Sequence, residues 1–178
     1  MKRVQGSGLL VECVNPRLRK YVIRWDVQPY IRKDEVSGEE RQEGFDYYEK
    51  WLNHKPTMDE VKEIVLSGMN ADIDRQILEG FVWNGMAIWL SSENQFNYKA
   101  AFDLAVQTNG ANLPVMFKFG TTQEPVYHTF LSVEELMDFY TQAMAYINGV
   151  LAEGWGKKDS MDWSGYEALL VEGDDKVI

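Results

Sequence analysis

Residues 80–95 read GFVWNGMAIWLSSENQ and contain, in order, signals for a helix end, a hairpin and a helix start. Asn84-Gly85 predicts the hairpin, because both central residues of a type I′ turn need a positive φ. Gly80 is placed to close the preceding helix as a left-handed cap, and Ser91 or Ser92 is placed to cap the next helix. The stretch therefore predicts a helix, a hairpin and a second helix in succession.

The preceding helix is predicted to begin at Thr57. Thr57 and Glu60 form a capping box, in which the hydroxyl accepts from the amide three residues on and the carboxylate reaches back to the cap amide. Apolar residues at helical spacing continue to Leu78. Gly68 costs about 1 kcal/mol relative to Ala inside a helix, so a kink or break near Ser67–Asn70 is an alternative to a straight helix.

The helix that follows the hairpin has few polar positions. Gln95, Lys99, Asp103 and Gln107 recur every four residues, and nearly everything else from Phe96 to Val106 is apolar or small. A helix of this composition is covered on most sides. It is therefore predicted to be the central element of the domain.

A second hairpin and a long helix are predicted next. Pro114–Phe119 and Pro125–Phe130 have strand composition and flank a short loop. Ser132 and Glu135 form another capping box, which starts a helix that runs to about Glu153. The glycines of Gly154-Trp155-Gly156 are predicted to end it.

The N-terminal segment has strand patterns. Leu9–Val14 and Lys20–Val27 read as two strands, and the second alternates in the manner of a half-buried antiparallel strand. Pro29 is predicted to end it, and Asp34–Glu43 to form a mobile loop. Phe45–Leu52 returns to strand composition, so a small three-stranded unit is expected.

The predicted fold class is α+β. A small antiparallel β unit, residues 1–55, precedes a domain of residues 56–178 with the order helix, hairpin, helix, hairpin, helix. A short helix around Trp163–Leu170 and a frayed tail, Glu172–Ile178, are expected at the end of the chain.

The formal net charge of −10 is unevenly spread. Residues 1–56 carry a net +2, whereas the remaining residues carry −12. Because phosphate repels such a negative surface, no nucleic acid partner is expected for the body of the protein. The basic N-terminal segment is expected to lie against the acidic part of its own chain or of a neighbouring subunit, with phosphate contact as the alternative. No apolar run approaches the ~18–20 residues of a membrane span, so no membrane partner is expected.

The sequence contains none of the common catalytic or nucleotide-binding motifs. His54 and His128 have no neighbouring Ser or Cys motif, and a structural hydrogen bond or an exposed side chain is expected of each. Cys13, the sole cysteine, lies in an apolar stretch, which favours an inert buried thiol. No cofactor and no metal site are predicted. An enzyme of unfamiliar type is an alternative that requires two acids in one cleft with pKa values pushed apart.

Two sets of side chains are candidate partner contacts. The first is a group of tryptophans that either forms a ligand platform or fills the core: Trp83, Trp89, Trp155 and Trp163. The second is an apolar stripe with a period of about 3.5 residues: Val133, Met137, Tyr140, Met144, Ile147 and Leu151. This stripe either forms a homo-oligomer seam or packs on the hairpins of its own chain.

Four segments carry a family resemblance. They are ILEGFVWNG (Ile77–Gly85), Trp89–Tyr98, KFGTTQEPVYHTF (Lys118–Phe130) and the predicted helix Leu131–Trp155. Together they resemble an uncharacterised domain family associated with phage tail and tail-fibre-assembly proteins and with prophages of gut bacteria. The likeness covers a little under half of the chain, and Gly80–Gly85 is its most specific piece.

The resemblance implies a non-enzymatic, prophage-encoded structural or assembly protein. Its expected partners are phage tail or fibre proteins, and its expected location is the cytoplasm or the virion. The family supplies no catalytic residue. A glycan- or peptide-binding module that uses exposed Trp and Tyr side chains is the alternative.

Overall fold

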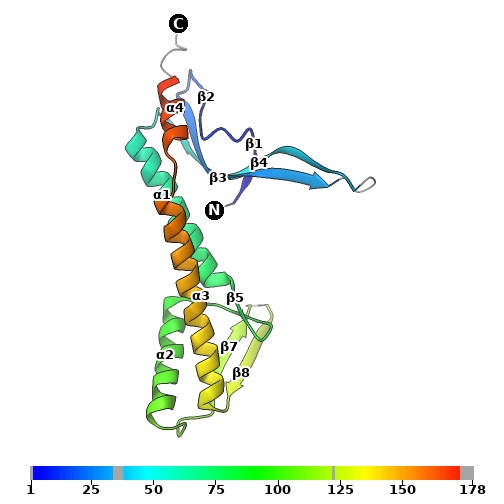
Figure 1. Cartoon of the computed structure of the whole chain (residues 1–178), viewed down its shortest axis with the longest axis vertical. Helices are drawn as coiled ribbons and strands as arrows, with labels where there is room; N and C mark the ends of the chain where they lie inside the picture. Colours follow the sequence, from blue (N-terminus) through cyan, green and yellow to red (C-terminus); the bar gives the residue numbers. More distant parts are fainter. Residues whose placement is uncertain (1, 34–37, 122, 173–178) are drawn as a thin grey trace. The chain divides into compact units, whose positions relative to one another are not determined.

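The structure is a computed structural model that describes residues 2–33, 38–121 and 123–172, and its fold is mixed α+β with antiparallel strands at the N-terminus (Figure 1). The chain forms two compact units: unit 1 is Met1–Met69 with Ser160–Ile178, and unit 2 is Asn70–Asp159. This division differs from the boundary expected after residue 55, because part of the first long helix and the last helix pack on the N-terminal sheet. Residues 34–37 of the expected loop and residues 173–178 of the expected tail lie outside the described residues.

Unit 1 contains a four-stranded antiparallel sheet. Its strands are β1 (Val4–Gly6), β2 (Val11–Asn15), β3 (Lys20–Lys33) and β4 (Glu40–Leu52). The strand order is β1-β4-β3-β2, so the two long strands are central. The expected three-stranded unit is corrected to four strands. A strand as short as β1 shows no alternation from which it could be predicted.

Both faces of β3 are covered near its start, so the prediction of a half-buried strand is wrong. Residues 22–25 are all buried. The Arg24 guanidinium lies over the Tyr47 ring, 4.9 Å from its centroid. Its Nη1 donates to the Leu9 carbonyl oxygen at 2.9 Å and to Glu12 Oε2 at 2.7 Å. The polar face of β3 is therefore buried by ion pairing and by the segment that joins β1 to β2.

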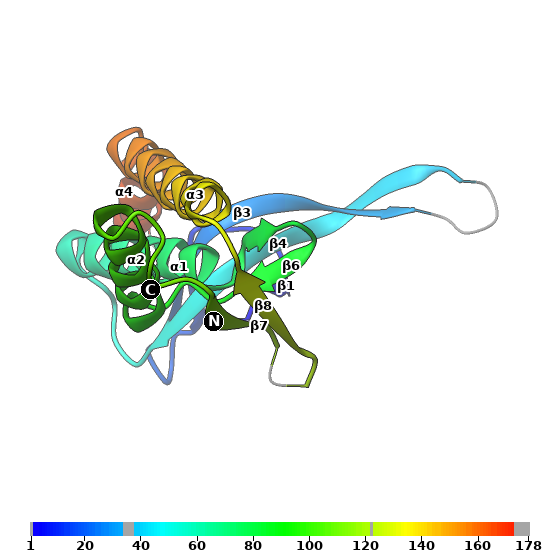
Figure 2. The same ribbon diagram turned by 90° about the horizontal axis from the view of Figure 1, so that it is seen from below.

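β3 and β4 continue as a two-stranded ribbon beyond the edge strands (Figures 1 and 2). Their pairing runs out to Lys33 opposite Glu40. The prediction that Pro29 ends the strand is wrong, since Pro29 lies opposite Phe45 within the ladder. Proline is tolerated there because no third strand pairs with this part of β3 within the described sheet. Residues 40–43, expected in a loop, belong to β4.

α1 (Met58–Glu79) begins at the predicted cap and continues without a break. The Glu60 N–H donates to Thr57 Oγ1 at 3.2 Å. The Glu60 carboxylate lies 2.8 Å from His54 Nε2, so its predicted reach to the cap amide is replaced by this contact. Gly68 is buried inside the helix, and an added Cβ would overlap the Trp25 ring. Close packing on the sheet therefore accounts for Gly68 without a kink.

α4 (Ser164–Glu172) brings the end of the described chain into the core of unit 1. Tyr166 packs with Val61 and Val65 of α1. Its hydroxyl donates to the Arg24 carbonyl oxygen at 2.8 Å. Burial raises the pKa of Tyr166 to about 12, so the phenol keeps its proton, and hence this hydrogen bond, at neutral pH.

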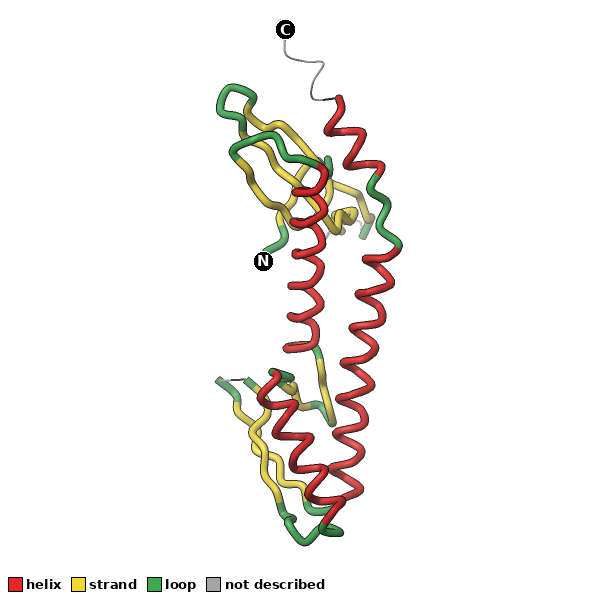
Figure 3. Tube along the Cα trace, turned by 90° about the vertical axis from the view of Figure 1, so that its left-hand side faces the viewer, coloured by secondary structure: helices red, strands yellow, loops and turns green. Residues whose placement is uncertain are grey.

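Unit 2 contains the end of α1, two hairpins and two further helices. These elements are β5 (Phe81–Trp83), β6 (Met86–Ile88), α2 (Ser92–Gln107), β7 (Val115–Gly120), β8 (Pro125–Phe130) and α3 (Val133–Asp159). Asn84 and Gly85 have φ values of 48° and 77°, the positive values that a type I′ turn requires. α2 and α3 lie side by side, and the β7–β8 hairpin packs against them (Figures 1 and 3).

Two glycine predictions in unit 2 are wrong for the same reason. Gly80 has no positive φ, and an added Cβ would overlap the Tyr146 hydroxyl, which donates to Gln76 O at 2.7 Å. α3 continues through Gly154 to Asp159, and a Cβ on Gly154 would overlap Ile73. Both glycines permit close approach of neighbouring elements. α1 does end at Glu79, directly before Gly80, but without the predicted left-handed cap.

Candidate protein-interaction surfaces

The four candidate tryptophans have different environments. Trp83 is buried and Trp163 is half-buried, whereas Trp89 and Trp155 are 47% and 55% exposed. The Trp163 ring packs in unit 1, with its centroid 5.7 Å from that of Tyr166. Core filling is therefore the alternative that holds for Trp83 and Trp163, whereas Trp89 and Trp155 are exposed.

Trp83 is held by an ionised carboxylate. Its Nε1 donates to Asp138 Oδ2 at 3.0 Å, and Gln142 Nε2 donates to the same oxygen at 2.8 Å. These bonds, that of Trp83 foremost, hold the pKa of Asp138 below its ordinary value of 3.8. The ring also meets Phe130 and Phe139, at centroid distances of 5.5 and 5.3 Å. Trp83 thus joins β5 to α3 and has no side-chain surface to offer a partner.

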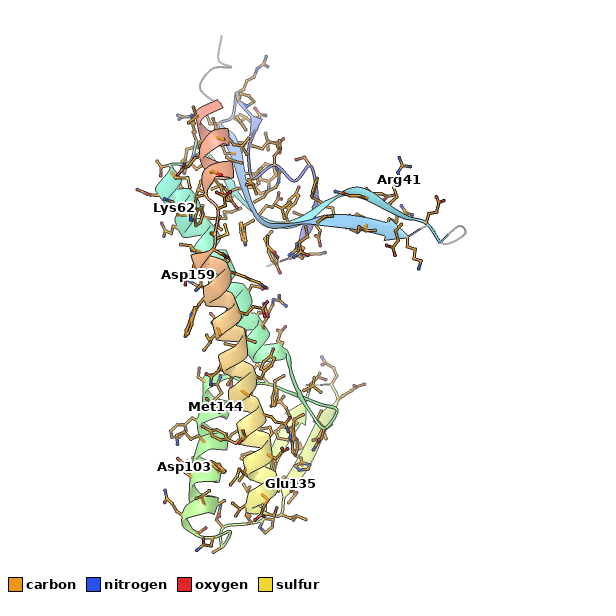
Figure 4. The ribbon with its side chains drawn as sticks, in the orientation of Figure 1. Arg41, Lys62, Asp103, Glu135, Met144 and Asp159 are labelled. Atoms are coloured by element: carbon orange, nitrogen blue, oxygen red, sulfur yellow. The ribbon has the colours of Figure 1, made fainter. Side chains whose placement is uncertain are left out.

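The candidate stripe on α3 packs mainly against its own unit. Ile147 is buried, and four further members pack against the core of unit 2: Val133, Tyr140, Met144 and Leu151. Figure 4 labels Met144 on this helix. Met137, by contrast, is exposed. The stripe therefore packs on its own chain, which is one of the two predicted alternatives. Little of its apolar surface remains exposed for contact with a second subunit.

His128 meets a carboxylate at the start of α3. Its Nε2 lies 2.9 Å from Glu135 Oε1, and its ring centroid is 4.6 Å from that of Phe130. The Glu135 N–H donates to Ser132 Oγ at 3.2 Å, and its carboxylate accepts from Leu131 N at 3.3 Å (Figure 4 labels Glu135). In the described chain no hydroxyl or thiol hydrogen bonds to His128, so the pair ties β8 to α3 and lacks a nucleophile.

One face of the β7–β8 hairpin is open. Side chains alternate across a strand, so the face opposite the core presents Met116, Lys118, Tyr127 and Thr129. These residues, together with the exposed Leu131 that directly follows β8, are here called the open face. Met116 and Tyr127 are each 61% exposed, and Leu131 is 72% exposed. Contiguous exposed apolar side chains mark interaction sites on soluble proteins. The residues of the open face were not singled out from the sequence, although strand alternation was the available signal.

α2 is not covered on most sides, and that prediction is wrong. Tyr98 and Ala105 are buried, and burial raises the pKa of Tyr98 to about 12. On the opposite side Phe96 is 71% exposed and Leu104 is 48% exposed, with Ala100 exposed between them. These three residues are called the outer face of α2. Its apolar composition is clear in the sequence, but what covers a helix depends on which elements pack around it.

The N-terminal basic residues pair within their own sheet. Arg3 Nε lies 2.9 Å from Asp46 Oδ2, and Arg24 Nη1 lies 2.7 Å from Glu12 Oε2. Arg32 is 3.5 Å from Glu43. The expectation that this segment lies against the acidic later part of the chain is therefore corrected for these arginines, because carboxylates on neighbouring strands are nearer.

Cys13 is exposed, so the prediction of a buried thiol is wrong. It lies on β2, an edge strand in which Val11 alone is buried. Across residues 2–33, 38–121 and 123–172 no group of three His, Cys, Asp or Glu side chains is arranged to hold a metal ion. Among the helices so described, none has the length and apolar character needed to cross a membrane.

No protein-family model matches the chain, and neither a curated protein nor a solved structure matches it. The resemblance to the phage tail-associated family is therefore still an expectation.

Proposed function

We propose that this chain is a non-enzymatic structural or assembly protein, prophage-encoded and tail-associated, that acts through contacts with phage tail or fibre proteins. The observation that carries the proposal is the open face of the β7–β8 hairpin. It combines Met116 and Tyr127 on one face of the hairpin, with the exposed Leu131 directly after β8. Aromatic residues and Met are enriched at protein interfaces, which makes another protein the best-fitting partner.

The polar residues of the open face fit the same role. Lys118 lies opposite Tyr127 and Thr129 lies opposite Met116 in the strand register. Interfaces typically combine apolar contacts with a polar rim that makes hydrogen bonds. The open face thus combines apolar side chains that can pack against a partner with polar side chains that can hydrogen bond to it. Such a contact between surfaces needs no deep apolar cavity.

Two carboxylates with lowered pKa values act as hydrogen-bond acceptors within their own units. Donors from Trp83 and Gln142 lower the pKa of Asp138, and donors from Ser164 lower that of Asp162. Asp162 Oδ1 accepts from Ser164 N at 2.9 Å, at the start of α4. Both carboxylates therefore serve as structural acceptors, whereas a general acid needs a raised pKa.

The phage context of the proposal comes from the resemblance of residues 74–157. In this proposal the order helix, hairpin, helix, hairpin, helix after Pro56 is the architecture shared with the tail-associated proteins. The tail or fibre proteins encoded beside this chain are accordingly the first partners to test.

Titration calorimetry with those purified tail and fibre proteins tests the proposal. We expect one of them to bind, and Tyr127→Glu combined with Met116→Glu to weaken binding at least about tenfold, since truncating or charging an anchor removes more than 1 kcal/mol. Val171→Glu is the matched control, because Val171 is exposed in unit 1, outside the open face. Equal weakening by the control, or no binding by any of these proteins, contradicts the proposal.

A further inference from the structure

The outer face of α2 is apolar, although no described residue of its own unit covers it. Phe96, Ala100 and Leu104 follow one another at steps of four residues, which places them in one row along the helix. The buried Tyr98 and Ala105 lie on the other side, where α2 meets α3 and the hairpins. The row therefore points away from the core and is available to a partner.

A charge pair borders this row. Lys99 Nζ and Asp103 Oδ2 form an ion pair along the helix (Figure 4 labels Asp103). At about 100° per residue, both side chains lie on the same flank of the row. Lys99 is nearer the start of the helix than Ala100, and Asp103 is nearer its end.

This order of charges lets two copies of the same patch attract each other when the helices pack antiparallel. In a symmetric pair, the same patch meets itself about a two-fold axis, so that residue i contacts residue j and j contacts i. When two α2 helices pack antiparallel about an axis between Ala100 and Ala101, Lys99 of each copy comes within about one residue of the level of Asp103 of the other, and nearer to it than to the other Lys99. Phe96 of each copy then faces Leu104 of the other. The small Ala100 at the centre permits the close axial approach of packed helices, about 8–10 Å.

The ribbon of β3 and β4 is a poorer site for a second copy. Its β3 edge contains Pro29, which has no N–H to donate. On β4 the register shifts between Gly44 and Gln42, so Glu43 interrupts the ladder. Proline, bulges and charges are the features that protect strand edges from pairing with other chains.

We propose that a second copy of this chain packs on the outer face of α2, in an antiparallel helix pair that joins Lys99 of each copy to Asp103 of the other. This homodimer goes beyond the proposed contact with tail proteins, which uses the open face. One face of a 16-residue helix is smaller than the roughly 800 Å² per partner of a standard interface, so we expect a weak, concentration-dependent dimer.

Sedimentation equilibrium of the full chain tests the dimer first. The wild type should dimerise with increasing concentration, and Phe96→Asp should weaken dimerisation at least about tenfold, because it places a charge in the apolar row. Tyr127→Glu is the matched control: it alters an aromatic residue of the open face and should leave the dimer unchanged. A wild type that stays monomeric up to about 1 mM overturns the proposal.

Charge exchange tests the orientation. Lys99→Asp and Asp103→Lys each break the pair within the helix, so any effect on α2 itself is common to both variants. Each variant alone should dimerise more weakly than the wild type, because like charges then meet across the two-fold axis. Mixing the two variants should give heterodimers in excess of either homodimer by native mass spectrometry, since opposite charges meet again.

A statistical mixture of the three dimers, or variants that dimerise as well as the wild type, overturns the antiparallel pairing. Circular dichroism of each variant checks that α2 stays folded. Because Tyr127→Glu leaves α2 intact and Phe96→Asp leaves the open face intact, failure of this dimer and failure of the tail-protein contact are separate outcomes.

Discussion

Gly68 shows how one position without a side chain can fix the packing of a helix on a sheet. The residue is buried in the middle of α1, where glycine is unfavourable by about 1 kcal/mol relative to Ala. Packing of the Trp25 ring offsets this cost, because the ring occupies the space that a Cβ would need. Local helix propensity is therefore outweighed by a contact with a residue far away in the sequence.

Gly68→Ala should lower the free energy of unfolding by about 1–3 kcal/mol, as overpacking of a close-packed core does. Urea unfolding followed by fluorescence or circular dichroism measures this change. Gly149→Ala is the matched control, because an added Cβ there meets nothing within 4 Å. The control should stabilise by up to about 1 kcal/mol through helix propensity. Similar changes in the two variants would show that Trp25 does not constrain Gly68.

Asp138 connects one residue's pKa with the pH dependence of stability. The hydrogen bond from Trp83 lowers the pKa of this carboxyl in the folded state. The ionised form is therefore favoured by folding, and its stabilising contribution is present above the ordinary pKa of 3.8. That contribution is lost as the pH falls through the lower, folded pKa.

Trp83→Phe keeps an aromatic ring but removes the donor, so the pKa of Asp138 should rise toward 3.8. NMR titration of the carboxyl carbon measures the pKa directly. The variant should also lose less stability than the wild type between neutral and acid pH. Gln142→Ala is the comparison, since it removes the smaller cause of the same shift. An unchanged pKa in Trp83→Phe would contradict the role assigned to this bond.

At the level of elements, short-range capping starts the helices. Ser91 Oγ accepts from Asn94 N at 3.2 Å, and Ser132 Oγ accepts from Glu135 N at 3.2 Å. The Ser132 cap was predicted from the sequence and Ser91 was one of two candidates for the other cap, because donor and acceptor are three residues apart. The end of α3 follows a different logic, as Gly154 shows: this glycine faces Ile73, a contact that the local sequence does not reveal.

Ser132→Ala should destabilise unit 2 by about 0.5–2 kcal/mol, the usual cost of a lost N-cap. The effect should appear as faster amide hydrogen exchange in the first turn of α3. Ser67→Ala is the control, because Ser67 is exposed inside α1 and Ala is the better helix former. Equal exchange in wild type and Ser132→Ala would mean that the His128–Glu135 contact holds the helix start without the cap.

At the level of the whole chain, the described residues form two hydrophobic cores that share no residue. One is centred on Phe130, Phe139 and Leu136 in unit 2, and the other on Ile23 and Val61 in unit 1. The core of unit 1 combines residues from both ends of the described chain, such as Ile23 and Tyr166. The expected boundary after residue 55 followed the change from strand to helix pattern, whereas the compact units follow packing.

Phe139→Ala should cost unit 2 about 3–5 kcal/mol, the usual range for Phe→Ala in a core. Native-state hydrogen exchange should show this loss in α2 and α3 and leave amides of β2 and β3 protected as before. Ile23→Ala is the reciprocal variant, expected to cost unit 1 about 2–5 kcal/mol. Loss of protection throughout the chain in either variant would show that the two cores unfold as one.

Much of the secondary structure follows from signals that span a few residues. Asn84-Gly85, the serine caps and the apolar periodicity of α1 and α3 each place an element near its observed position. Such signals are local because a turn or cap is made by hydrogen bonds between residues close in the chain. The mixed α+β class was therefore predictable.

Burial was decided only by the tertiary structure. Three features depend on distant residues: the exposure of the outer face of α2, the covering of both faces of β3, and the continuation of α3 through Gly154. The same apolar row can be core or surface, since apolar area is buried by whatever element lies opposite and not by the row itself. For that reason the candidate surfaces can be identified only from the packed structure. The same packing buries Trp83, which was a candidate partner contact in the sequence.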